Sequence, residues 1–191
     1  VFFRDLGLPM PDVNLEVGSG SHSVQTAEIM LRIERVLLEH KPGIVLVYGD
    51  VNSTVAAALV AVKLGIAVAH VEAGLRSGNI YHPWPEEINR KIIGSMASLH
   101  FAPTETSAAA LKAENVDAGR IHVTGNTVID ALHWVSARIA AEPTLATTDR
   151  SRTSTSSAAA LLTPRRRWRA TNARSWRSTR RWVRSSRVVS M

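Results

Sequence analysis

The chain has 191 residues, of which 45% are hydrophobic and none is cysteine. This length predicts one or two domains, and the composition is sufficient for a buried core. The lack of cysteine excludes disulfides and thiolate metal sites and is typical of a cytoplasmic protein. No apolar run approaches the roughly 18 to 20 residues that a membrane span needs, so no membrane partner is expected. Because the chain begins with Val1 rather than Met, we expect an N-terminal portion to be missing.

The net charge of +7 is distributed unevenly along the chain. All 12 charged residues from Arg150 to Met191 are arginines, which leaves 11 basic and 16 acidic residues in positions 1–149. Residues 1–149 therefore have the charge of a mildly acidic domain, and the last 42 residues alone make the sequence strongly basic.

Helices and strands are predicted to alternate from residue 22 to residue 140. Amphipathic patterns predict the helices, with Asn52 or Ser53 expected as a cap, and short apolar runs rich in β-branched residues predict buried strands. Near-continuous apolar strands between helices indicate an α/β fold with a Rossmann-like, doubly wound parallel sheet. In chain order, the predicted elements are helix 22–40, strand 44–48, helix 52–64, strand 66–71, helix 86–97, strand 99–102, helix 104–115, strand 121–124 and helix 127–140.

The arginine-rich end of the chain has neither helical nor strand periodicity. We expect residues 1–145 to form a partial Rossmann-like domain and residues 146–191 to be a disordered Arg/Ser/Trp-rich tail. Arginine without lysine, mixed with Ser, Thr, Ala and Trp, is typical of GC-rich DNA translated in a shifted frame. Two alternatives are a solvated linker and a nucleic-acid-binding arm, in which Arg would contact phosphates and Trp would stack on bases.

Polar residues or glycines follow every predicted strand. The four strand ends carry Gly49-Asp50, Glu72, Pro103-Thr104 and Gly125-Asn126. Ligands bind at the carboxyl ends of the strands in open parallel sheets, so this coincidence predicts a binding cleft. The sequence has no phosphate-binding Gly-x-x-x-x-Gly-Lys loop, no complete dinucleotide fingerprint and no Gly-x-Ser-x-Gly nucleophile elbow.

Each candidate residue also has a purely structural interpretation. Asp50 precedes a predicted helix, so it can cap that helix or face the cleft. His70 and Glu72 are two residues apart and are expected on one face of their strand, where a metal pair is conceivable but lacks a third ligand. A buried, hydrogen-bonded His70 is the simpler interpretation. Glu72, beside a glycine-containing loop, is harder to explain by packing.

The stretch from Tyr81 to Arg90 is the most informative part of the sequence. Two prolines stiffen the approach to a helix in which Glu86 and Arg90 form an i, i+4 pair, with Ile88, Ile92 and Met96 expected in the core. An exposed helical ion pair adds only about 0.3–0.5 kcal/mol, and that is the structural alternative. The functional interpretation is that this pair follows a rigid loop overhanging the strand ends.

Several motifs of the sequence, in order and at consistent spacing, resemble those of the non-hydrolysing UDP-N-acetylglucosamine 2-epimerases. The resemblance covers the chain from its start to about residue 145. The motifs are Gly49-Asp50-Val51-Asn52-Ser53-Thr54, His70-Val71-Glu72-Ala73-Gly74-Leu75-Arg76-Ser77-Gly78, Pro85-Glu86-Glu87-Ile88-Asn89-Arg90, Pro103-Thr104-Glu105 and Val123-Thr124-Gly125-Asn126-Thr127-Val128-Ile129-Asp130-Ala131-Leu132.

The resemblance implies two facing Rossmann-like domains of the glycosyltransferase-B type, of which this chain would carry the incomplete first. It implies interconversion of UDP-N-acetylglucosamine and UDP-N-acetylmannosamine without metal or other cofactor, in a cytoplasmic homodimer. It further implies that Asp50, Glu72 and Glu86 are the acid/base carboxylates and that Arg90 and Asn126 serve substrate binding. UDP is understood to be eliminated across C1 and C2 of the sugar and then added back, which needs proton-transfer groups on both faces.

The sequence departs from the family pattern at both ends. The opening strand and its loop are absent, as is a C-terminal domain that holds a catalytic histidine and most of the uridine and diphosphate contacts. We therefore expect a truncated, frameshifted chain that is inactive by itself. One alternative is a hydrolysing relative, which releases UDP and free N-acetylmannosamine. The other is a protein that binds nucleic acid through the basic tail, and that binding is expected to be non-specific.

Overall fold

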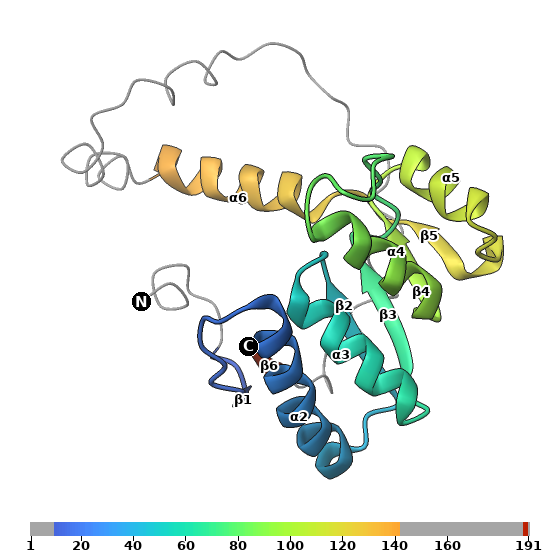
Figure 1. Cartoon of the computed structure of the whole chain (residues 1–191). Helices are drawn as coiled ribbons and strands as arrows, with labels where there is room; N and C mark the ends of the chain where they lie inside the picture. Colours follow the sequence, from blue (N-terminus) through green and yellow to red (C-terminus); the bar gives the residue numbers. More distant parts are fainter. Residues whose placement is uncertain (1–9, 142–188, 191) are drawn as a thin grey trace. The chain divides into compact units, whose positions relative to one another are not determined.

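The computed structural model describes residues 10–141 and 189–190 (Figure 1). The described residues fall into two compact units, one with residues 10–130 and 189–190 and the other with residues 131–141. We describe each unit by itself. The predicted domain boundary at residue 145 and nearly all of the predicted disordered tail lie outside the described residues, so both stay predictions.

A four-stranded parallel sheet is the centre of the first unit. Its strands are β2 (Ile44–Tyr48), β3 (Ala67–Val71), β4 (Leu99–Ala102) and β5 (Ile121–Val123), and their spatial order is β2-β3-β4-β5. The four apolar runs predicted as strands are these four, within two residues at each end, and the predicted parallel α/β class is confirmed. Because parallel strands end at the same edge, the four segments that follow them meet at one side of the sheet.

Five helices accompany these strands in the described part of the chain. They are α2 (His22–His40), α3 (Asn52–Lys63), α4 (Glu86–Met96), α5 (Glu105–Ala113) and α6 (Thr127–Ala141), with a short 3-10 turn at Ala118–Arg120. Of these, α3, α4 and α5 connect successive strands of the sheet, α2 precedes β2 and α6 follows β5. All five predicted helices are confirmed, with ends that differ by two residues or fewer. None of the described helices is both long and apolar enough to cross a membrane.

The core forms where α2 packs on α3 and α3 packs on the sheet. On α2, Ile29, Ile33 and Leu37 are buried at four-residue spacing, so they lie along one stripe of the helix. The facing stretch of α3 is rich in alanine, including fully buried Ala56, Ala58 and Ala61. Small side chains allow the two helices to approach closely, and the resulting contact fixes the start of α3 next to the turn that follows β2.

The prediction that Asn52 or Ser53 caps α3 is wrong. The residue at the N-cap is Val51, which has no side-chain capping hydrogen bond. The Asn52 amide instead donates to Gln25 Oε1 at 2.9 Å and hydrogen-bonds His22 Nδ1 at 2.9 Å, so it is committed to α2. The Asn52 side chain, which the local sequence pattern assigned to the helix cap, therefore makes a contact between two helices instead.

The predicted core face of α4 is confirmed only in part. Met96 packs against the core and Ile88 is partly buried. Ile92, however, is 38% exposed, and Ile93 is fully buried in its place. The helix instead presents Glu87 and Asn89 together with Ile93 and Gly94 to the interior. Two buried polar residues at its start thus set the rotation of α4, because each has hydrogen-bond partners on its buried side.

Two very short strands pair outside the main sheet. β1 (Val13–Asn14) and β6 (Val189–Ser190) are parallel, with Val13 opposite Val189 and Asn14 opposite Ser190. Neither was predicted, and β6 lies within the segment assigned to the disordered tail. A two-residue pairing between positions so far apart leaves no periodic signal in the sequence.

Candidate functional site

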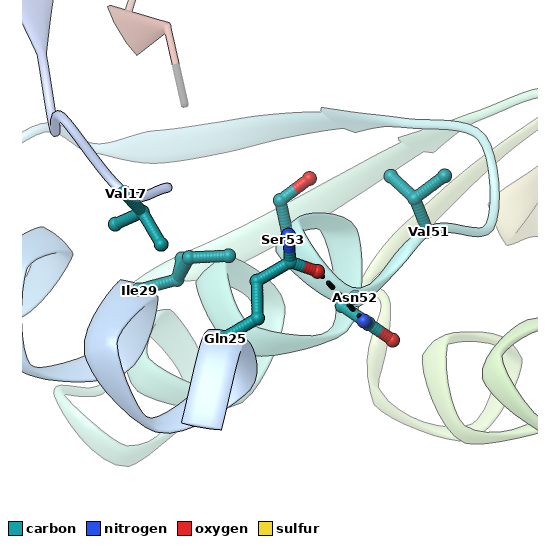
Figure 2. Close-up of a pocket in the computed structure, with 6 residues that line it drawn as sticks. All are labelled: Val17, Gln25, Ile29, Val51, Asn52 and Ser53. Carbon is teal, nitrogen blue, oxygen red and sulfur yellow. Dashed lines mark hydrogen bonds between the residues drawn. The ribbon is translucent and has the colours of Figure 1, made fainter. Parts of the chain in front are cut away.

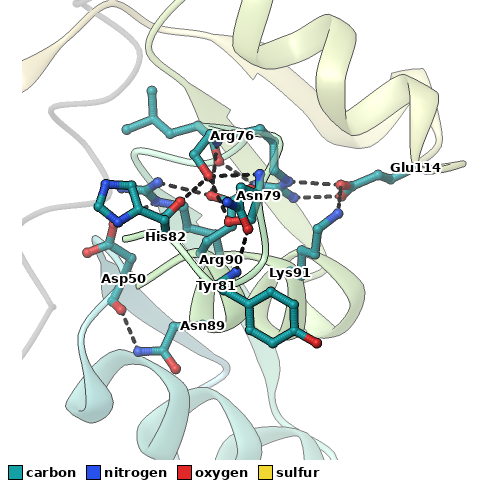
Figure 3. Close-up of polar contacts among 12 residues, drawn as sticks. Asp50, Arg76, Asn79, Tyr81, His82, Asn89, Arg90, Lys91 and Glu114 are labelled. Atoms are coloured by element: carbon teal, nitrogen blue, oxygen red, sulfur yellow. Dashed lines mark hydrogen bonds and ion pairs between the residues drawn. The ribbon is translucent and has the colours of Figure 1, made fainter. Parts of the chain in front are cut away.

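The turn after β2 places Asp50 against α4. Gly49 makes the turn with φ +73°, a conformation that glycine adopts without strain. The Asp50 carboxylate then accepts a hydrogen bond from Arg90 Nε at 2.7 Å, and the Asp50 carbonyl accepts one from the Asn89 amide at 2.7 Å (Figure 3). Asp50 is thus held by two consecutive residues of α4, 39 and 40 positions along the chain. It does not cap α3, so its structural alternative is excluded.

Glu72 lies next to this ion pair. Glu72 Oε2 is 3.7 Å from the point at which a side chain on Gly49 would begin, so the carboxylate reaches over the turn after β2. Burial raises the pKa of Glu72, the nearby Asp50 charge raises it further, and Arg90 opposes the rise. The same side chain lines a small crevice at the strand ends together with Pro103, Gly125 and Asn126.

The backbone at Glu72 is itself unusual. Its φ is +68°, in the left-handed region that residues with a side chain rarely adopt. Such conformations cost about 1–3 kcal/mol and gather at functional sites, where the surrounding structure enforces them. β3 ends at Val71, so the alternation of side chains along the strand stops one residue before Glu72. Strand alternation therefore does not extend to Glu72, although the His70 ring and the Glu72 carboxylate both lie close to Gly49.

His70 is a buried structural histidine. Its Nε2 is 2.8 Å from the Gly49 carbonyl, and burial is the main reason why the His70 pKa is lowered. The interpretation of a buried, hydrogen-bonded His70 is confirmed, and the bond ties β3 to the turn that carries Asp50. Among residues 10–141 and 189–190, no group of three or more His, Cys, Asp or Glu residues could hold a metal ion.

Glu86 is the first residue of α4 and is partly buried. It lies one helical turn before Arg90, on the same side of the helix. The predicted Glu86–Arg90 ion pair is wrong, because the partner of Arg90 on α4 is Glu87, with Arg90 Nη1 3.1 Å from Glu87 Oε2. Within the described residues, no hydrogen bond or ion pair holds the Glu86 carboxylate.

Glu87 was missed by the sequence interpretation. It is fully buried, and its Oε2 also accepts a hydrogen bond from the Ser77 N–H at 3.1 Å. Either glutamate of the Glu86-Glu87 pair is within helical reach of Arg90, at i+4 or at i+3. The spacing of Glu87 and Arg90 can be read from the sequence. The loop that folds over Glu87 and selects it over Glu86 is seen only in the structure.

Asn126 follows β5 and begins α6. Its Oδ1 accepts a hydrogen bond from the Val128 N–H at 2.9 Å, which is a local turn that prepares the helix start. Nearby, the Tyr48 hydroxyl at the end of β2 is 2.9 Å from Thr127 Oγ1, so the end of β2 is connected to the first residue of α6. Asn126 therefore has a structural role in addition to its place beside Glu72.

A second ion-pair cluster fixes the loop between β3 and α4. Arg76 binds Glu114 through Nε at 2.9 Å and Nη2 at 2.6 Å, and Lys91 Nζ is 2.9 Å from the same carboxylate. The Arg76 hydrogen bonds are the main reason why the Glu114 pKa is lowered to about 2. The loop that leads from Glu72 to Glu86 is thereby held at the C-terminal end of α5 (Figure 3).

None of these carboxylates lines the pocket at the start of α2 and α3. It has a volume of about 280 Å³ and lies between the N-terminal ends of α2 and α3, where Gln25 and Asn52 hydrogen-bond each other (Figure 2). None of the five site residues predicted from the sequence lines it. Its wall is formed by Val17, Gln25, Ile29, Val51, Asn52 and Ser53.

The structure thus brings together Asp50, Glu72 and Arg90 at the carboxyl ends of β2 and β3, with Glu86 one helical turn from Arg90. This arrangement defines an α/β domain with an acidic cluster at the carboxyl ends of its parallel strands, which is the edge at which sheets of this kind bind ligands.

Comparison with known proteins identifies the family to which this domain belongs. The family model for UDP-N-acetylglucosamine 2-epimerase matches residues 1–186. The chain belongs to the UDP-N-acetylglucosamine 2-epimerase family.

Individual relatives agree with the family match. A UDP-N-acetylglucosamine 2-epimerase of Methanocaldococcus jannaschii is 50% identical over 131 residues, which is 69% of this chain and 35% of that protein. A solved structure of the enzyme from the same organism has a TM-score of 0.64 at 50% identity, covering 68% of this chain and 36% of that chain. The Neisseria meningitidis enzyme bound to UDP-GlcNAc has a TM-score of 0.73 at 36% identity, covering 78% and 41%. The chain spans about a third of the length of the relatives it matches.

Proposed function

We propose that Asp50, Glu72 and Glu86 are the acid/base carboxylates of a non-hydrolysing UDP-N-acetylglucosamine 2-epimerase, and that Arg90 and Asn126 contribute to substrate binding. The main support is the Glu72 carboxyl group, whose pKa is raised by burial and by Asp50 at the carboxyl ends of the strands. Carboxyl groups whose environments differ in this way can divide the acid and base roles between them.

The proposed reaction has two steps that conserve the UDP group. In the first, the C1–O bond to UDP breaks while a proton leaves C2, which gives a C1=C2 double bond and free UDP. In the second, UDP adds back to C1 and a proton arrives at the opposite face of C2. Net inversion at C2 requires one proton acceptor and one proton donor on opposite faces of the sugar ring.

The geometry supports different roles for the three carboxylates. Glu72, with its raised pKa, suits the group that donates a proton to C2. Asp50 is ion-paired with Arg90, which suits a group that positions the substrate or accepts a proton. The Glu86 carboxylate has no ion-pair partner in the described part of the chain, so it is available to a ligand at the start of α4.

The chain covers about a third of its relatives, so the test uses a chimera. Residues 10–130 of this chain would replace the aligned segment of the M. jannaschii 2-epimerase, which is 50% identical. We expect the chimera to convert UDP-GlcNAc to UDP-ManNAc, as observed by ¹H NMR of the anomeric protons. A matched chimera with Glu28→Gln, which removes an exposed carboxylate of α2, should keep this activity.

The same NMR spectra separate the two classes of epimerase. A non-hydrolysing enzyme gives an equilibrium mixture of two UDP-sugars, whereas a hydrolysing one accumulates UDP and free N-acetylmannosamine. Accumulation of the free sugar would replace our proposal with the hydrolysing alternative. A correctly folded chimera without any turnover would contradict the proposal that these residues can serve as the site.

A further inference from the structure

Glu87 is the most deeply buried carboxylate of the described chain. Its side chain is fully buried, and a buried carboxylate is costly unless it is paired and hydrogen-bonded. A single oxygen, Oε2, makes both of its contacts, with the Ser77 N–H at 3.1 Å and with Arg90 Nη1 at 3.1 Å. The hydrogen-bond partners of the Glu87 carboxylate are therefore Ser77 and Arg90, and its side chain is not in contact with solvent.

Arg90 connects Glu87 to the proposed site. Its Nη1 faces Glu87, while its Nε donates to Asp50 Oδ2 at 2.7 Å. The Arg90 side chain is 18% exposed and the Asp50 side chain is 23% exposed. The guanidinium group is planar and rigid, so a partner at one of its nitrogens fixes the direction of the others. Figure 3 shows Arg90 between Asp50 and the loop from β3 to α4.

The hydrogen bond from Ser77 connects the loop between β3 and α4 to the Glu87 carboxylate. The Ser77 hydroxyl is also within hydrogen-bonding distance of the Asn79 and His82 carbonyls, so the conformation of the loop depends on the position of Ser77. Glu87 Oε2 is thus the one atom that contacts both the loop and Arg90 in the described part of the chain. A change at Glu87 should reach Asp50 through Arg90 and the loop through Ser77.

We propose that Glu87 is a positioning residue, which holds the Arg90 guanidinium in the orientation that presents Nε to Asp50 and does not itself contact the substrate. This inference rests on the proposed function, since Asp50 is one of the proposed acid/base groups.

The protonation of Glu87 agrees with a positioning role. Burial by itself would raise the Glu87 pKa, but the Ser77 N–H and the Arg90 ion pair together hold that pKa below its ordinary value. The carboxylate therefore stays ionised at neutral pH and keeps its attraction for Arg90. Glu72, with its pKa shifted in the opposite direction, is the better candidate for proton transfer.

The test follows the Arg90 Nε–H in the full chain by ¹⁵N NMR, with Arg90→Lys to assign the signal. We expect slow hydrogen exchange at this proton in the wild-type chain, because it is bonded to Asp50. Glu87→Gln should increase the exchange rate by about ten- to a hundredfold, which corresponds to the loss of one hydrogen bond to a charged group. Glu86→Gln is the matched control, since it removes the same charge one residue away, and it should leave the exchange rate unchanged.

Two results would overturn the proposal. One is wild-type exchange of the Arg90 Nε–H in a folded Glu87→Gln variant, and the other is an equal effect of Glu86→Gln. If Glu87→Gln does not fold, Glu87→Asp keeps the charge but withdraws the carboxylate from Arg90. It should accelerate the exchange in the same direction, and wild-type exchange in that variant would equally refute the proposal.

Activity of the chimera separates this proposal from the proposed function. There, Glu87→Gln should lower kcat with little change in KM, and Glu87→Gln combined with Arg90→Lys should be no worse than Arg90→Lys alone. Fully multiplicative losses would show that Glu87 acts independently of Arg90. If the parent chimera has no turnover, the proposed function fails, whereas the NMR result on the full chain still decides the role of Glu87.

Discussion

Replacement of Gly74 by alanine tests whether the loop after Glu72 is as tightly packed as the structure shows. Gly74 has φ +85°, and a Cβ placed there would lie 2.2 Å from the Ser107 carbonyl oxygen and 3.0 Å from Leu111 Cδ1. Ser107 is buried and belongs to α5, so its backbone has little room to move. Gly78 is the matched control, because its φ is +80° but nothing lies within 4 Å of the position that its Cβ would occupy.

The two substitutions share one cost and differ in another. An L-residue in the left-handed region costs about 1–2 kcal/mol, and both variants should lose this much. Gly74→Ala adds a steric overlap with buried backbone, for which overpacking costs of about 1–3 kcal/mol are usual. We therefore expect Gly74→Ala to destabilise the chain by about 2–5 kcal/mol and Gly78→Ala by about 1–2 kcal/mol.

Urea denaturation followed by circular dichroism measures both changes on the full chain. Insoluble Gly74→Ala protein beside soluble Gly78→Ala protein would agree with the reasoning in a qualitative way. Equal free energies of unfolding for the two variants would refute it, because the contact with Ser107 would then contribute nothing.

Three further predictions concern the carboxylates. In the chimera, Glu86→Gln should lower turnover by about 10²- to 10⁴-fold if Glu86 is an acid/base group, and near-normal turnover would remove it from the site. Arg90→Gln should raise the Glu72 pKa further, because Arg90 is the charge that opposes the rise; a ¹³C carboxyl titration measures this, with Lys91→Gln as control. Glu114 has a pKa of about 2 against an ordinary 4.5, so its ion pairs stabilise the fold above pH 4.5 and lose that contribution as the pH falls towards 2. Arg76→Gln should therefore reduce the loss of stability over this interval in acid denaturation, and an unchanged acid profile would contradict the assignment.

Element positions were predictable because each is encoded locally. Helix α2 has its apolar residues at helical spacing and ends before Pro42-Gly43, and β2 is an uninterrupted apolar run. The cluster of polar residues at the strand ends was predictable for a different reason, because the strands of a parallel sheet all end at the same edge. The arrangement of Asp50 beside Glu72 follows from the pairing of β2 with β3.

Side-chain partners were not predictable, because tertiary contacts compete with local ones. Asn52 has the residue type of a helix cap but hydrogen-bonds α2 instead. Arg90 can reach Glu86 or Glu87 by helical spacing alone, and the choice depends on the loop that places Ser77 over Glu87. The rotation of α4 follows from the same buried contacts, which is why Ile93 rather than Ile92 lies in the core.

Incorporation of deuterium at C2 of the sugar tests the central claim most directly. In D₂O, the chimera should give UDP-ManNAc that carries deuterium at C2, because the proposed donor takes its proton from the solvent and a different group removes the original proton from C2. Glu72→Gln should reduce the rate of incorporation by at least about 10²-fold, the usual contribution of a positioned acid–base group. Incorporation at the parent rate in a folded Glu72→Gln chimera would show that Glu72 takes no part in proton transfer.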